Sequence, residues 1–205
     1  EIAAFARGLL DRAAPLELDR PSLDVCGTGG SGLTRFNVST TAAFILAAAG
    51  VPVAKHGNRG SLKPNGSFDL LDQLGVRYAL PPKALATLHR DTGVCFLFAR
   101  QMHPTAAAVA PYRKAAGRRT IFNLAGPLAN PCGPRCQLVG ATNERTGRVI
   151  AEAMTRLAVS RATVVWGGPG IDEFSVTGDN RCLLVAGSSS RLVIVPALHP
   201  SLEHE

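Results

Sequence analysis

The sequence predicts an α/β fold with a mainly parallel central sheet and flanking helices. Two observations indicate this class. Short apolar runs alternate along the chain with segments of helical spacing, which is the order of elements in βαβ proteins. The run over 94–98, Val-Cys-Phe-Leu-Phe, lacks polar alternation, as in a parallel strand covered on both faces. The 205 residues, 46% of them hydrophobic, are enough to bury one sizeable core.

Helices are predicted in six segments. Ile2, Phe5 and Leu9 recur at helical spacing in the first segment. We end the second segment before Gly50, because a glycine commonly ends a helix. We begin the fifth at Pro104, because the missing N–H of a proline is tolerated in the first turn of a helix. The six segments cover residues 2–13, 38–49, 68–74, 83–90, 104–116 and 145–157.

Strands are predicted where short apolar runs are bounded by turn residues. The last two runs flank residues 187–190, Gly-Ser-Ser-Ser, and are typical of a hairpin. The predicted strands cover residues 23–26, 51–55, 94–98, 138–141, 162–166, 182–185 and 192–195.

Charge and composition limit the classes of partner. The formal net charge is +7, which favours an anionic partner. The basic residues are scattered and only 5% of residues are aromatic, so few side chains are available to stack on bases. A small phosphorylated ligand is therefore favoured over nucleic acid.

The cysteines and the apolar runs indicate a compartment. Five dispersed cysteines form no even disulfide set, and the close pair Cys132 and Cys136 lacks the second pair of a zinc site. No apolar run approaches 18 residues, and no signal peptide is evident. We therefore predict a cytoplasmic protein without a membrane span.

A glycine-rich loop is the most informative motif. Residues 24–40, DVCGTGGSGLTRFNVST, have the order strand, glycine loop, helix. Such a loop brings backbone N–H groups around a bound anion, and the following helix adds the positive end of its dipole. An ordinary tight turn is the alternative, which four glycines in six residues disfavour. Neither the dinucleotide pattern nor the nucleotide P-loop is present, so we interpret the loop as an unusual phosphate cradle.

Three further loops, KHGNR (55–59), FARQMHP (98–104) and GGPGIDE (167–173), also follow predicted strands. Ligands bind beyond the carboxyl ends of parallel strands, so we expect all four loops to gather at one edge. Lys55, His56, Asn58 and Arg59 would form a polar wall for an anionic substrate, with a solvated loop as the alternative.

Four more residues suggest a function only when they are considered together with the glycine loop. Asp172 and Glu173 are adjacent carboxylates of the kind that hold Mg²⁺ together with substrate phosphates. Taken alone, His103 is better explained as a helix cap, and Arg113 as a charge on a helix surface.

Together these motifs resemble the anthranilate phosphoribosyltransferase family. The matching blocks stand in the family's order and at its spacing, over almost the whole chain. They are DVCGTGGSG (24–32), FNVST (36–40), VAKHGNR (53–59), GSFDLLDQLGV (66–76), FLFARQMHP (96–104), RTIFNLAGPLANP (119–131) and GIDEFSVTG (170–178).

The resemblance implies a fold, an assembly and a reaction. Residues 1–20 would be a remnant of a small helical domain, and residues 21–205 an α/β phosphoribosyltransferase domain, with the helix over 104–117 packing on the helical part. A homodimer would form through a complete helical domain. The reaction would join anthranilate to 5-phosphoribosyl 1-diphosphate (PRPP), releasing diphosphate in a Mg²⁺-dependent step of tryptophan biosynthesis.

The resemblance also implies site residues, matched motif by motif. The PRPP contacts would be Gly27, Thr28, Gly29, Gly30, Asn37, Ser39, Thr40, Lys55 and Lys63. The anthranilate contacts would be His56, Asn58, His103 and Arg113, and the Mg²⁺ ligands Ser39, Asp172 and Glu173. No catalytic nucleophile is assigned, because metal charge, loop amides and positioning suffice for this displacement.

The chain departs from the family pattern at three places. Ser31 replaces an acidic residue, Leu62 and Lys63 replace a serine pair, and Arg100 replaces a proline. Two other functions therefore stay open. One is a related phosphoribosyltransferase or a nucleoside phosphorylase with a different acceptor. The other is a non-catalytic homologue whose basic groove binds nucleic acid or a partner.

Overall fold

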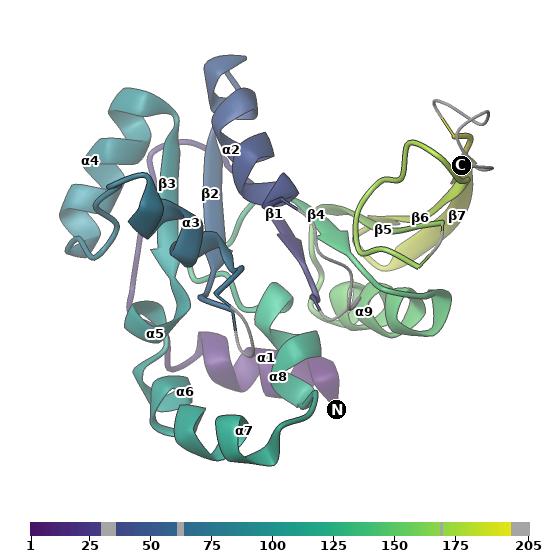
Figure 1. Cartoon of the computed structure of the whole chain (residues 1–205), viewed down its shortest axis with the longest axis horizontal. Helices are drawn as coiled ribbons and strands as arrows, with labels where there is room; N and C mark the ends of the chain where they lie inside the picture. Colours follow the sequence, from purple (N-terminus) through teal and green to yellow (C-terminus); the bar gives the residue numbers. More distant parts are fainter. Residues whose placement is uncertain (30–35, 61–63, 169, 198–205) are drawn as a thin grey trace.

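The computed structural model describes residues 1–29, 36–60, 64–168 and 170–197, and these confirm the α/β class. A seven-stranded sheet in the order β3-β2-β1-β4-β5-β6-β7 runs through the molecule (Figure 1). The first five strands in this order are parallel, and β6 and β7 continue the sheet in antiparallel fashion. The strands are β1 (Leu23–Gly27), β2 (Val53–Gly57), β3 (Val94–Phe98), β4 (Cys136–Gly140), β5 (Arg161–Gly167), β6 (Asn180–Ala186) and β7 (Ser189–Val195).

Every predicted strand is present, and β3 alone has the predicted bounds; the shift of β2 matters most for the site. We expected residues 51–55, whereas β2 covers Val53–Gly57. His56 pairs with Leu97 of β3 within the sheet, and Lys55 pairs with Phe96. Lys55 and His56 are therefore strand residues rather than parts of a loop. Both faces of β2 are covered, so polar side chains can be buried on either face.

The helices are more fragmented than the sequence predicts. The expected helix over 104–116 is two helices that meet at Val109. The cause is Pro111, which has no N–H to donate and whose ring excludes the carbonyl four residues earlier. The short helices over 99–102 and 121–125 were not predicted. The helices are α1 (Ile2–Leu10), α2 (Val38–Ala48), α3 (Ser67–Gln73), α4 (Pro82–Thr92), α5 (Ala99–Met102), α6 (Pro104–Ala108), α7 (Ala110–Ala116), α8 (Ile121–Ala125), the 3-10 turn η1 (Gly126–Leu128) and α9 (Glu144–Arg156).

Helices cover both faces of the sheet. Val25, Val53 and Phe96 pack with α2 and α3 on one face. The neighbouring strand positions point the other way, where α9 packs on β5–β7 and α4 on β3. Gly147 lets α9 approach closely, since a Cβ there would lie 2.7 Å from Trp166 Cε3.

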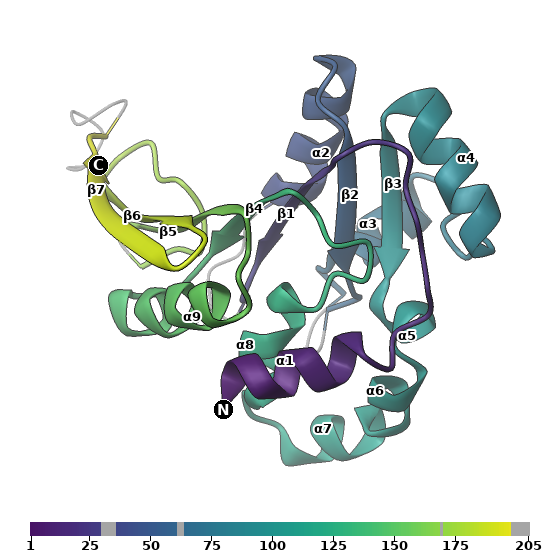
Figure 2. The same cartoon turned by 180° about the vertical axis from the view of Figure 1, so that it is seen from behind.

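Beyond the carboxyl ends of β2 and β3, α1 gathers with α5–α8, as both views show (Figures 1 and 2). The helix α1 packs on α8, η1 and α9. The division into two domains at residue 20 stays a prediction. No helix within the described ranges is both long enough and apolar enough to span a bilayer.

Candidate active site

The register of the sheet brings the four predicted loops to one edge. Gly27 at the end of β1 pairs with Gly140 of β4, and Gly57 at the end of β2 pairs with Phe98 of β3. The carboxyl ends of these strands are therefore level. The loop after β5 reaches back to the same place, as the contacts of Asp172 show.

The glycine loop and the acidic pair meet directly. The Gly29 N–H donates to Asp172 Oδ2 at 2.7 Å, across 143 residues of sequence. A Cβ on Gly27 would lie 2.6 Å from the same oxygen, so only glycine allows this approach. Gly29 itself has a φ of +64°, which favours glycine for a different reason. These two glycines thus hold the loop amides against a carboxylate. Gly30 lies outside the described residues.

Two buried hydroxyls lie in the sequence before and after residues 30–35 of the glycine loop, which are outside the described residues. Thr28 follows β1, and Thr40 lies in the first turn of α2; both are buried. Among the described residues, neither Oγ1 atom has a hydrogen-bond partner. Asn37 occupies the N-cap position of α2, and the half-buried Ser39 follows it in the same turn. Buried hydroxyls without partners beside loop amides are suited to an oxygen-rich ligand.

Lys55 is buried within β2 and is not exposed at the edge of the sheet. Its side chain is 1% exposed, and its Nζ donates to Val25 O at 2.6 Å. The buried Asp24 carboxylate accepts the His56 N–H at 3.1 Å. Desolvation raises the pKa of Asp24 to about 6, against the attraction of Lys55, and lowers the pKa of Lys55. Contact between Lys55 and PRPP stays a prediction, and it requires the side chain to leave this position.

Two predicted anthranilate contacts, His56 and His103, form a buried pair. Their ring centroids lie 5.1 Å apart in an edge-to-face arrangement. His103 Nε2 is 2.8 Å from Ala129 O and its Nδ1 is 3.3 Å from Leu9 O, so this ring joins the segment after η1 to α1. Desolvation is the main cause that lowers the pKa of His56 to about 3, and the electrostatic effects of His103 and Lys55 lower it further. His56 is therefore neutral near pH 7.

Arg113 of α7 is held over an aromatic ring. Its guanidinium carbon lies 4.5 Å from the ring centroid of Phe122, which itself packs edge-to-face on Phe5 at 5.0 Å. Desolvation lowers the pKa of Arg113, and its Nε has no hydrogen-bond partner within the described part of the chain. Stacking fixes the guanidinium plane while leaving its fork able to take a carboxylate.

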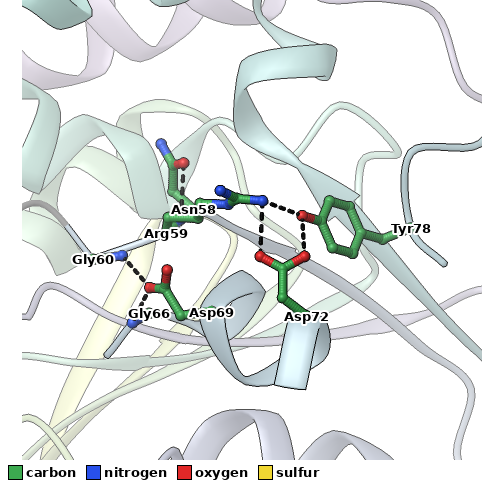
Figure 3. A network of polar contacts seen from close by, with 7 residues as sticks. All are labelled: Asn58, Arg59, Gly60, Gly66, Asp69, Asp72 and Tyr78. Carbon is green, nitrogen blue, oxygen red and sulfur yellow. Dashed lines mark hydrogen bonds and ion pairs between the residues drawn. The ribbon is translucent and has the colours of Figure 1, made fainter. Parts of the chain in front are cut away.

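The structure corrects the polar-wall interpretation at Arg59. Its guanidinium donates to Tyr78 Oη at 2.8 Å and pairs with Asp72 at 2.7 Å (Figure 3). Asn58, by contrast, is half-buried at the edge. The KHGNR motif therefore divides into buried residues, one edge residue and one anchoring arginine. Lys63 lies outside the described residues.

Asp172 and Glu173 are compatible with Mg²⁺. A Mg²⁺ ion is usually held by one or two carboxylates together with substrate phosphates and water, so a complete protein cage is not required. Among the described residues, no group of three or more His, Cys, Asp or Glu is arranged to hold a metal. The position of Asp172 beside the Gly29 amide fits shared binding of a cation and a phosphate.

Sequence reasoning missed two supporting residues. Arg119 donates to Thr142 Oγ1 at 3.3 Å and lies 3.5 Å from Thr28 O, so it links the start of α8 to the glycine loop. Asn130 donates to Ala54 O at 2.8 Å and braces β2. Both residues lie within the block RTIFNLAGPLANP, where no local pattern signals these long-range contacts.

Comparison with known proteins identifies the family of this chain. Residues 19–203 match the family model described as the a/b domain of a glycosyl transferase family. The chain belongs to this glycosyl transferase family.

Within the family, the chain is similar to anthranilate phosphoribosyltransferases. That of Moorella thermoacetica is 47% identical over 88% of this chain and 54% of its own length. The enzyme of Erythrobacter litoralis is 41% identical over 100% of this chain and 62% of its own length. The chain thus spans little more than half the length of these relatives.

Solved structures agree in fold. Anthranilate phosphoribosyltransferase from Thermus thermophilus has a TM-score of 0.84 and 44% identity, covering 94% of this chain and 57% of its own. The Saccharomyces cerevisiae enzyme in complex with PRPP and Mg has a TM-score of 0.86 and 30% identity. This match covers 100% of this chain and 57% of the yeast chain. The resemblance drawn from the motifs is confirmed.

Proposed function

We propose that this protein transfers the phosphoribosyl group of PRPP to anthranilate, giving N-(5-phosphoribosyl)anthranilate and diphosphate in tryptophan biosynthesis. The observation that carries the proposal is the 2.7 Å hydrogen bond from the Gly29 N–H to Asp172 Oδ2. It joins the loop expected to bind diphosphate to the carboxylate expected to bind Mg²⁺. The relatives named above support the substrates.

The diphosphate of PRPP would bind at the glycine loop and the first turn of α2. The Gly29 amide already donates to a carboxylate, so it is oriented toward an anion. The unpartnered hydroxyls of Thr28 and Thr40, taken among the described residues, offer two further donors. On PRPP binding, Asp172 would release this amide to a phosphate oxygen.

The leaving group needs its charge neutralised. Asp172, Glu173 and Ser39 would hold Mg²⁺, which when bound supplies positive charge to the departing diphosphate. The loop amides and the α2 dipole act in the same direction, since both present positive partial charge to an anion.

Anthranilate would be held by its carboxylate on the Arg113 guanidinium, which can donate two parallel hydrogen bonds. Asn58 and the His56–His103 pair would line the approach. The aromatic amine is itself a nucleophile, so positioning it near the anomeric carbon supplies much of the remaining rate enhancement.

The cysteines do not provide an alternative nucleophile: two of them are buried and three half-buried, and Cys136 begins β4, at the amino end of that strand. Burial raises the pKa of Cys95 to about 12 and also raises those of Cys26, Cys132 and Cys182. These thiols are protonated near pH 7, and the thiolate is the reactive form. Direct displacement by the amine is therefore the favoured reaction.

The proposal has a direct assay. The protein is mixed with PRPP, Mg²⁺ and anthranilate, and the loss of anthranilate fluorescence is followed together with diphosphate release. We expect both signals, and neither without Mg²⁺. A folded preparation that turns over no anthranilate rejects the proposal. Diphosphate release with another aromatic acceptor, or nucleoside cleavage by phosphate, would favour the related enzymes.

We also propose a cytoplasmic homodimer. All five cysteines are free, which suits a reducing compartment. The dimer rests on the resemblance alone and would use the helical part. Sedimentation equilibrium tests it, because a monomer across the micromolar range contradicts it.

A further inference from the structure

Asp69 of α3 holds two backbone amides with one oxygen. Gly60 N–H donates to Asp69 Oδ2 at 2.7 Å, and Gly66 N–H donates to the same atom at 2.8 Å (Figure 3). Gly66 is the N-cap of α3 and Asp69 is its third residue, so the second bond is part of a helix cap. The first bond is not explained by capping, because Gly60 lies outside the helix.

The exit of β2 packs directly on the start of α3. A Cβ at Gly66 would lie 2.5 Å from Asn58 O, so this backbone contact requires glycine. The Phe68 N–H also points to Asn58 O, at 3.5 Å. Asp69 therefore closes a contact in which the two backbone segments already touch.

A second anchor lies beside the first. Arg59 pairs with Asp72 at 2.7 Å, and Tyr78 Oη donates to the other oxygen of Asp72 at 2.7 Å (Figure 3). The Tyr78 ring packs edge-to-face on Phe68 at 4.7 Å. The arginine next to Asn58 is thus tied to α3 and to its aromatic support.

Asn58 lies next to both anchors. Its Oδ1 accepts the Arg59 N–H at 2.9 Å, which leaves the amide nitrogen as the donor toward a ligand. That nitrogen points away from Asp69 (Figure 3). We propose that Asp69 is a positioning residue that fixes the exit of β2, and with it the Asn58 carboxamide, for the acceptor. The inference rests on the proposed function and adds a residue to it.

Three substitutions separate positioning from capping. Asp69→Ala removes both bonds. Asp69→Glu keeps a residue that caps helices well at this position but moves the oxygen relative to Gly60. Asp69→Asn keeps a side-chain oxygen at the same distance from the backbone, so it can still accept both amide N–H groups. Asp91→Ala is the control, because Asp91 forms an exposed pair with Arg90. The readouts are kcat, KM for each substrate, the melting temperature and hydrogen exchange of the Gly60 and Gly66 amides.

We expect Asp69→Ala to raise KM for anthranilate about tenfold, as loss of ordered hydrogen bonds to a charged group does. Asp69→Glu should keep the melting temperature and the Gly66 protection, yet raise KM about threefold and speed exchange at Gly60. Asp69→Asn should change KM least. KM for PRPP and the control variant should stay near the wild-type values.

The opposite pattern overturns the proposal. If Asp69→Glu keeps wild-type KM and Gly60 protection, or if Asp69→Ala lowers only the melting temperature, Asp69 is a helix cap and nothing more. If Asp69→Ala does not fold, the Glu and Asn variants decide. If the wild type uses no anthranilate, the proposed function fails by itself. Exchange at Gly60 in Asp69→Glu then decides the anchor: faster exchange supports it and unchanged exchange rejects it.

Discussion

Two polar regions lie along the same sheet edge and differ in how their groups are satisfied. The buried network consists of Asp24, Lys55, His56, His103 and Asn130, all nearly inaccessible to solvent. The edge site is the proposed substrate site and would consist of Gly29, Asn58, Arg113, Asp172 and Glu173. In the buried network, side chains bind backbone groups of neighbouring elements. In the edge site, a loop amide donates to a carboxylate, from Gly29 to Asp172, and the Arg113 guanidinium stacks on a ring rather than binding a backbone group.

One sequence motif contributes residues to both regions. Lys55 and Asn58 stand three positions apart in KHGNR, yet the first is buried and the second lies at the edge. The buried network braces the strands whose ends carry the edge site. Damage to the first region should therefore reduce stability, and damage to the second should reduce binding and turnover.

The largest effect is expected from Lys55→Met. It leaves the Asp24 carboxylate buried without its cation, which costs about 3–5 kcal/mol of the free energy of unfolding. Because the pKa of Asp24 is raised to about 6 even beside Lys55, the carboxyl can protonate in acid. The loss measured by urea unfolding should be larger at pH 8 than at pH 5. Lys83→Met, at an exposed position, is the control. Equal and small losses for both variants would show that Lys55 is not part of a brace.

Asp172→Asn is expected to act on turnover instead. Removing one metal-binding carboxylate should lower kcat about 100–1,000-fold, comparable to loss of one electrostatic contributor to the transition state. The melting temperature should change little, since the Asn side-chain oxygen can still accept the Gly29 N–H. Glu173→Gln should act in the same direction. Asp179→Asn is the matched control, because Asp179 is exposed. Mg²⁺ titration curves identical to wild type would remove the metal role.

Burial of His56 in its neutral form should make the protein less stable as the pH falls below 6.5. Its pKa is about 3 when folded, against 6.5 as the ordinary value, so below pH 6.5 the unfolded chain binds a proton that the folded protein does not. The contribution of His56 to the free energy of unfolding is fully present above pH 6.5. It falls by about 2 kcal/mol as the pH is lowered to 5. Asp24 opposes it, because its raised pKa favours the folded state in acid.

The comparison of wild type with His56→Gln isolates the histidine. We expect the variant's free energy of unfolding to fall less steeply between pH 6.5 and pH 5, as measured by urea unfolding. Parallel profiles for the two proteins would mean that His56 is not buried in its neutral form.

The smallest effect is expected from Arg113. Arg113→Lys should raise KM for anthranilate about fivefold and Arg113→Ala about tenfold, since lysine keeps the charge but loses the fork. Arg156→Ala, which breaks an exposed pair with Glu152, should leave KM unchanged. A change confined to KM for PRPP would place Arg113 in the other subsite.

The sheet and the meeting of its loops could be predicted from the sequence, because apolar runs and glycine punctuation are local signals. Strand 94–98 is correct at both ends. The helix over 104–116 was wrong in one respect, and Pro111 was the signal that it divides. The unpredicted α8 also had a signal in the sequence, since Thr120 and Asn123 are spaced three residues apart at its start and the Thr120 N–H donates to Asn123 Oδ1 at 2.9 Å.

Burial of charge could not be predicted. Nothing in KHGNR distinguishes Lys55, which enters the sheet, from Arg59, which pairs with Asp72 on α3. That distinction depends on β2 continuing to Gly57 between two covered faces. The contact of Gly29 with Asp172 depends likewise on the register of β1 with β4, which only the fold sets.

Metal-dependent binding of PRPP beside Gly29 and Asp172 is best measured by calorimetric titration with PRPP. The titration is run with and without Mg²⁺, on the wild type and on Asp172→Asn. We predict measurable heat with a single site only when Mg²⁺ is present, and loss of that Mg²⁺ dependence in the variant. Absence of heat in every condition, or equal affinity with and without the metal in the wild type, would contradict the account.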